Sequence, residues 1–100
     1  MMCELGRARS FFEGALIDYM KTCQYLVENC LMGKETKKVT LWSIKGITDR
    51  YEGKIEGVFF FCETVGDDQF EELTYLYDRA FEKLQELRKN YEFLVESVEL

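Results

Sequence analysis

The chain has 100 residues, 47% of them apolar and 15% aromatic, and a formal net charge of −6 with no histidine and no proline. This length fits a single domain, 1–100, and the composition is typical of a folded protein and excludes a disordered one. The acidic balance disfavours a general binder of nucleic acid or of anionic membranes, and no apolar run reaches the roughly eighteen residues of a membrane span.

Residues 5–32 are predicted to form the first helix. Apolar side chains recur there at steps of three and four residues, which is the spacing of one helix face. They are Phe12, Leu16, Tyr19, Met20, Cys23, Leu26, Val27 and Cys30. "SFFE" at 10–13 has the pattern of a capping box, so Ser10 is expected to begin the regular helix. Gly33 is expected to end it in the left-handed conformation.

The middle of the chain is predicted to form a β-hairpin. Residues 39–47 and 55–64 are rich in β-branched and aromatic side chains, which is typical of strands. "TDRYEGK" at 48–54 supplies the turn, and Gly57 is expected to mark a bulge. The second strand contains "VFFFC" at 58–62, which places apolar side chains on both of its faces. One face therefore needs a cover that the hairpin itself does not provide.

Residues 65–72, "VGDDQFEE", are expected to begin the last helix, with Asp68 as its N-cap. An apolar stripe then continues with no proline or glycine to interrupt it. It consists of Phe70, Leu73, Tyr77, Ala80, Leu84, Leu87, Tyr91, Leu94 and Val98. Thirty helical residues span about 45 Å, against about 30 Å for a hairpin of nine-residue strands. The far end of this helix is expected to extend beyond the sheet.

These elements predict an α+β fold in the order helix, strand, strand, helix. Because an isolated two-stranded sheet is marginally stable, we expect a homodimer that completes the sheet or the core. The overhanging helix also needs either the first helix or a second copy to cover its apolar side chains. The candidate dimer or partner interface consists of Phe60, Leu87, Tyr91, Leu94 and Val98.

No combination of residues indicates catalysis, so we expect no catalytic residue, no cofactor and no metal site. The cysteines, Cys3, Cys23, Cys30 and Cys62, form no CxxC pair, and no histidine can complete a zinc site or act as the base for a nucleophile. Cys23 and Cys30 would lie about 10 Å apart along one helix, too far for a disulfide. The acidic residues at 67–72 are interpreted as helix-capping side chains.

The predicted function is a non-enzymatic protein–protein interaction module, such as an adaptor, a small subunit or an inhibitor. Free thiols and the lack of a signal-peptide pattern favour a soluble protein of the cytoplasm. Two alternatives stay open. One is a nucleic-acid-associated protein that uses the basic side chains of 34–54, namely Lys37, Lys38, Lys45, Arg50 and Lys54. The other is a pocket for a small ligand or substrate, lined by tyrosine and cysteine.

Overall fold

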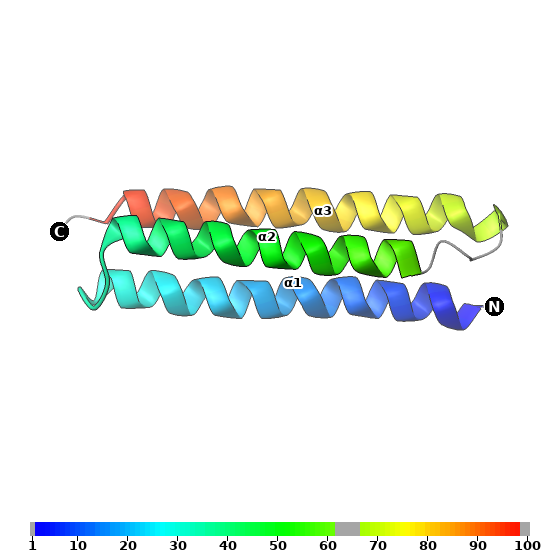
Figure 1. Ribbon diagram of the computed structural model, residues 1–100, viewed down its shortest axis with the longest axis horizontal. Coiled ribbons are helices and arrows are strands. Elements are labelled where there is room, and N and C mark those ends of the chain that lie inside the picture. Colours follow the sequence, from blue (N-terminus) through cyan, green and yellow to red (C-terminus); the bar gives the residue numbers. More distant parts are fainter. Residues whose placement is uncertain (1, 62–66, 99–100) are drawn as a thin grey trace.

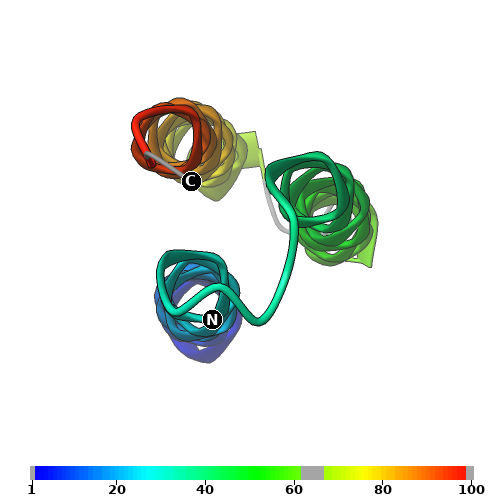
Figure 2. The same cartoon turned by 90° about the vertical axis from the view of Figure 1, so that its left-hand side faces the viewer.

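The computed structural model of the chain is a three-helix bundle (Figure 1). It describes residues 2–61 and 67–98, and the side chains of residues 5–60 and 69–98. The helices are α1 (Met2–Leu31), α2 (Lys37–Phe61) and α3 (Asp67–Glu96). α1 and α3 run in the same direction and α2 runs against both, so that the end-on view shows three axes at the corners of a triangle (Figure 2). The result is a rod of 53 by 16 by 14 Å.

The predicted first helix is confirmed, although its start is not. All eight apolar residues expected on its inner face are buried or partly buried in the core that the three helices share. The capping box at Ser10 is wrong, because α1 begins at Met2 and runs through Ser10 without a break. Ala8 is buried in the core and Leu5 packs against it, so tertiary contacts extend the helix toward the N-terminus.

The end of α1 and the start of α2 follow from local backbone chemistry. Gly33 has a φ of +74°, as predicted, and its N–H donates to the Cys30 carbonyl while the Lys34 N–H donates to the Asn29 carbonyl. These two bonds form a Schellman motif, which ends the helix. Thr36 then caps α2, since its Oγ1 accepts from the Val39 N–H at 3.2 Å.

The predicted β-hairpin, and with it the α+β fold class, is wrong. Residues 37–61 form one continuous helix, and the described residues contain no strand; positions 62–64 of the expected second strand lie outside them. The inner face of α2 has helical spacing, but two of its four fully buried residues are threonines: Thr40, Ile44, Thr48 and Ile55. A count of apolar residues alone misses this periodicity. Packing against α1 and α3 then outweighs the strand preference of the β-branched side chains.

The last helix is confirmed, and it begins at Asp67, one residue before the predicted cap. Leu73, Leu84 and Tyr91 of its apolar stripe are buried as expected. Near the C-terminus the core position passes from Leu94, which is 49% exposed, to the buried Val95. An ideal helix drifts about 20° per heptad relative to a strict seven-residue repeat, and this drift carries Leu94 off the inner face.

The thiols of Cys23 and Cys30 are both free and buried, as predicted. The side chains of Cys3 and Cys62 lie outside the described ones. Among the residues that the structure describes, no group of three or more His, Cys, Asp or Glu side chains can hold a metal ion. None of the helices, over the same residues, has the length and apolar character required to cross a membrane.

The helical assignment of residues 48–54 is testable through glycine. Gly46 and Gly53 are exposed in α2, and a Cβ at either position meets no atom within 4 Å. Gly46→Ala and Gly53→Ala are therefore expected to raise the free energy of unfolding by about 0.5–1 kcal/mol each, because alanine favours the helix. Urea unfolding measures this change.

Gly33→Ala is the matched control and is expected to destabilise the chain by about 1 kcal/mol, since Gly33 alone among the described glycines has a positive φ. A loss of stability in Gly53→Ala would contradict the helix and indicate a turn at that position.

Candidate functional site

A cluster of tyrosines lies at the centre of the bundle, with one contributed by each helix. Tyr19 of α1 is fully buried, and its ring packs edge-on against Tyr51 of α2 and Tyr91 of α3, at centroid distances of 5.7 and 6.3 Å. Its hydroxyl lies 2.7 Å from Thr48 Oγ1. Because Thr48 donates its single hydroxyl proton to the Ile44 carbonyl at 2.7 Å, Tyr19 is the donor to Thr48.

Burial also governs the acidity of this cluster. It raises the pKa of Tyr19 well above its ordinary value. Burial likewise raises the pKa of the Cys23 thiol to about 11, against a smaller lowering by Tyr19. A protonated, inaccessible thiol is a poor nucleophile and a poor metal ligand. The cluster packs the three helices together and joins α1 to α2 by a hydrogen bond.

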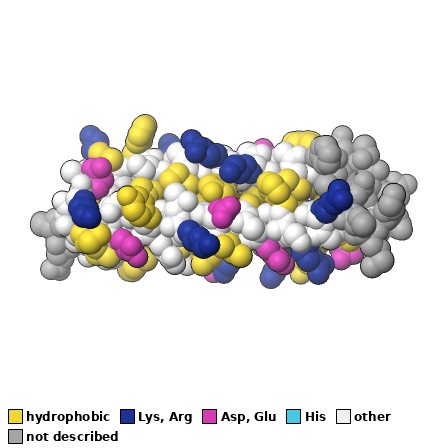
Figure 3. All heavy atoms as spheres, turned by 90° about the horizontal axis from the view of Figure 1, so that it is seen from below, with side chains coloured by type: hydrophobic (Ala, Val, Ile, Leu, Met, Phe, Trp, Pro, Cys, Tyr) yellow, Lys and Arg dark blue, Asp and Glu magenta, His cyan; other side chains and the backbone are white. Residues whose placement is uncertain are grey.

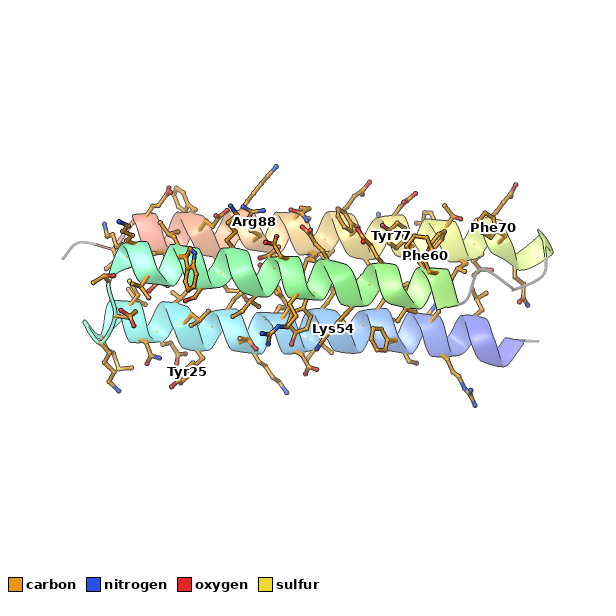
Figure 4. The ribbon with its side chains drawn as sticks, in the orientation of Figure 1. Tyr25, Lys54, Phe60, Phe70, Tyr77 and Arg88 are labelled. Atoms are coloured by element: carbon orange, nitrogen blue, oxygen red, sulfur yellow. The ribbon has the colours of Figure 1, made fainter. Side chains whose placement is uncertain are left out.

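A second cluster, which we call the aromatic strip, lies across α2 and α3 and reaches the surface (Figure 4). Phe59 is its centre, with its ring 4.7 Å from Tyr77, 6.0 Å from Phe70 and 6.0 Å from Phe60, and Tyr77 in turn lies 6.0 Å from Phe81. Phe60 is 63% exposed and Phe70 41%, while the other three rings are partly buried. The rings thus form a continuous apolar surface over one end of the α2–α3 seam.

Carboxylates border the strip on both helices. Glu52 and Glu56 precede Phe59 and Phe60 by one to two helical turns, and Asp78 follows Tyr77 on α3. Glu52 is fixed across the seam by a 2.5 Å hydrogen bond from Gln85 Nε2. Burial raises the pKa of Tyr77, and the negative charges of Glu56, Asp78 and Glu52 raise it further. Glu52, Glu56 and Phe59 share one face of α2 at helical spacing, and Asp78 is the neighbour of Tyr77 on α3, so the three carboxylates lie around the strip.

Two positive side chains, Lys54 of α2 and Arg79 of α3, lie over rings that do not belong to the aromatic strip. Lys54 Nζ lies 4.6 Å above the Tyr51 ring, and the Arg79 guanidinium lies 5.9 Å from the Tyr75 ring. Figure 4 shows Lys54 on the side of α2 that faces α1. Within the described part of the chain, no cation–ring contact involves the aromatic strip.

The other faces of the bundle are less distinctive. A groove of about 470 Å³ between α1 and α3 has an apolar floor that includes Phe12 and Leu76, and its rims carry both positive and negative side chains. Figure 3, which views the rod from the α1 side, shows apolar side chains in a row along the rod with charges of both signs around them. This mixed pattern selects no particular class of ligand.

The structure separates the five residues of the predicted partner interface. Leu87, Tyr91 and Val98 are buried in the core of the chain itself, so a partner does not reach them while the bundle is closed. Phe60 and Leu94 are exposed, but Phe60 lies near the end of α2 and Leu94 near the end of α3, at opposite ends of the rod. Phe60 alone belongs to the aromatic strip.

The five predicted nucleic-acid contacts all lie on α2 but do not share a face. Lys45 and Arg50 are five residues apart, which places them about 140° apart around the helix axis. Lys37 donates to the Glu96 carbonyl at 3.2 Å, and Lys54 covers Tyr51. The helix thus distributes these basic side chains over separate flanks, whereas a β-hairpin was expected to bring them together. Nucleic-acid binding stays an untested prediction.

The sequence pattern predicts Phe70 and Tyr77 of the strip on one face of the last helix, but it leaves Phe81 out of that stripe. It predicts Phe60 as an interface residue, although it places Phe59 and Phe60 in a strand. Helical spacing from Glu52 through Glu56 to Phe59 and Phe60 was the available signal.

Comparison with known proteins gives no match to a family model, to a curated protein or to a solved structure.

The Tyr19–Thr48 hydrogen bond predicts an asymmetric pair of variants. Thr48→Val leaves the buried Tyr19 hydroxyl without an acceptor and is expected to cost about 1–3 kcal/mol of unfolding free energy. Tyr19→Phe should cost less, about 0.5–1.5 kcal/mol, because Thr48 keeps its bond to Ile44. The double variant should be more stable than Thr48→Val alone, because it removes the hydroxyl that has lost its acceptor. Costs that add within about 0.3 kcal/mol in urea unfolding would show that the hydroxyls do not interact.

The raised pKa of Cys23 predicts a loss of stability in base. The unfolded thiol ionises near 9.0 and the folded one near 11, so the unfolded chain releases this proton first as the pH rises. The stabilisation is complete below pH 9 and is lost toward pH 11, with a slope of at most about 1.4 kcal/mol per pH unit from this group. Urea unfolding at a series of pH values measures the slope. Cys23→Ala should reduce it, and an unchanged slope would exclude Cys23 as a source.

Proposed function

We propose that this chain is a non-enzymatic protein-interaction module, an adaptor, small subunit or inhibitor, that also associates with a second copy of itself. The observation that supports the proposal is the exposure of twelve large apolar side chains, between 41% and 75%, among the described residues of a chain of 100. Scattered exposed apolar residues are common, but contiguous ones mark interaction surfaces. Here several gather into two groups.

The first group is the aromatic strip, and the second lies where α1 passes into α2. This second group, the α1–α2 end, consists of Leu31, Met32, Val39 and Trp42, with Trp42 75% exposed. Full burial of such a side chain contributes about 1.5–3 kcal/mol. The two groups lie at opposite ends of the rod, so the module can contact a second copy and another protein at the same time.

Self-association was first expected because a two-stranded sheet would leave one face uncovered. That reason does not apply to a helical bundle, and the exposed α1–α2 end now supports the proposal in its place. The free, buried thiols of Cys23 and Cys30 fit a reducing compartment, and we include a cytoplasmic location in the proposal for that reason.

Trp42 provides the measurement of self-association, since it is the single tryptophan of the chain. Light scattering during gel filtration is expected to give twice the chain mass of 11.9 kDa at high micromolar concentration. Dilution should shift the Trp42 emission to longer wavelength as the ring returns to water. A mass that stays at 11.9 kDa, with emission independent of concentration, would refute self-association at this end.

Two variants locate the contact. Trp42→Ser should return the chain to monomer, whereas Phe60→Ser, at the other end of the rod, should leave the dimer intact. Both side chains are largely exposed, so neither change removes a core contact.

A further inference from the structure

We infer that the aromatic strip binds a cationic amphipathic helix of a partner protein, one that presents arginine side chains beside its own apolar face. This inference rests on the proposed interaction function and names the partner of one surface. The strip lies along a seam between two antiparallel helices, and such a seam accepts a third helix on its outer side (Figure 1).

The size of the strip sets the size of the partner segment. Phe70 and Phe81 are eleven residues apart on α3, which corresponds to about 17 Å along the axis. A helix of about three turns covers that length. The apolar side of such a helix would lie on the five rings, two of which, Phe60 and Phe70, are already open to solvent.

The negative charge around the rings favours a partner helix with positive side chains. Glu52 and Glu56 lie on the α2 side of the strip and Asp78 on the α3 side, so positive side chains on both flanks of a docked helix find a carboxylate. Guanidinium groups are the better fit, because they pair with carboxylates in bidentate geometry and stack on aromatic faces. The chain already holds two of its own rings under cations, Tyr51 under Lys54 and Tyr75 under Arg79.

The same charges argue against two other occupants. A second copy of the strip would bring three carboxylates against three more, and juxtaposed like charges cost several kcal/mol at an interface. Nucleic acid would meet the same carboxylates with its phosphates. A positively charged helix from another protein is the occupant that the surface favours.

Three synthetic peptides test the inference against the full chain. The probe is a fluorescently labelled 18-residue amphipathic helix of leucine, alanine and arginine, long enough to cover the strip. In the first matched peptide citrulline replaces every arginine, which keeps the shape and removes the charge. In the second, glutamate replaces arginine. Fluorescence anisotropy at low salt is expected to show binding of the arginine peptide, binding weaker by about tenfold or more for the citrulline peptide, and none for the glutamate peptide.

Variants of the chain locate the contact. Phe60→Ser is expected to weaken binding of the arginine peptide by about tenfold or more, as truncation of an aromatic anchor does. Glu56→Gln leaves the rings in place and should reduce the salt dependence of binding. Trp42→Ser, at the other end of the rod, should bind like the unaltered chain, and circular dichroism confirms that each variant stays helical.

Several results would overturn the inference. The inference fails if the arginine peptide does not bind at low salt, or if the arginine and citrulline peptides bind with equal affinity. It also fails if Trp42→Ser loses as much binding as Phe60→Ser. Dissociation of the dimer by Phe60→Ser would also overturn it, because the strip would then be a contact between copies. Self-association through Trp42 is measured without any peptide, so the failure of one proposal is distinguishable from the failure of the other.

Discussion

The contacts of Tyr19 constrain the whole bundle. Its ring is fully buried between a tyrosine from each of the other two helices, and its hydroxyl bonds to Thr48 of α2. Apolar packing tolerates a helix that slides or rotates, whereas a buried hydroxyl must keep its partner. The bond therefore fixes the level of α2 against α1, and the hydrogen bond that the Tyr91 hydroxyl donates to the Met20 carbonyl at 3.4 Å holds α3 against α1. The aromatic strip depends on this register, because Phe59 meets Tyr77 only when α2 and α3 are correctly aligned.

The buried threonines of α2 also make this helix difficult to recognise from the sequence. Thr40 and Thr48 donate their hydroxyl protons to the carbonyls four residues earlier, which lets a β-branched polar residue occupy the inside of a helix at low cost. In the amino-acid sequence alone, the same threonines favour a strand, and Gly53 and Gly57 favour a turn and a bulge. The glycines lie on the outer side of α2, where a missing side chain affects only helix propensity.

α1 and α3 were predictable because their inner faces are almost wholly apolar and repeat over many turns. Most of the buried positions of both follow from spacing alone, whereas the buried Ala15 and Val95 do not. α2 was not predictable in this way, since its identity depends on the two neighbours that bury it. The candidate site inherits this division. Phe70 and Tyr77 belong to the predicted stripe of α3 and Phe81 does not, while the α2 rings and carboxylates converge with them only once 37–61 is helical.

The carboxylates around the strip give an exposed aromatic surface a border of negative charge. Five neighbouring rings on a rod only 53 Å long would otherwise join copies of the chain to one another. Glu52, Glu56 and Asp78 set a charge of one sign around those rings, and this charge opposes contact between like surfaces without covering the rings. Repulsion of copies and attraction of a cationic helix are then two consequences of the same arrangement. Neutralising these residues would remove the selectivity of the strip and leave its apolar area unchanged.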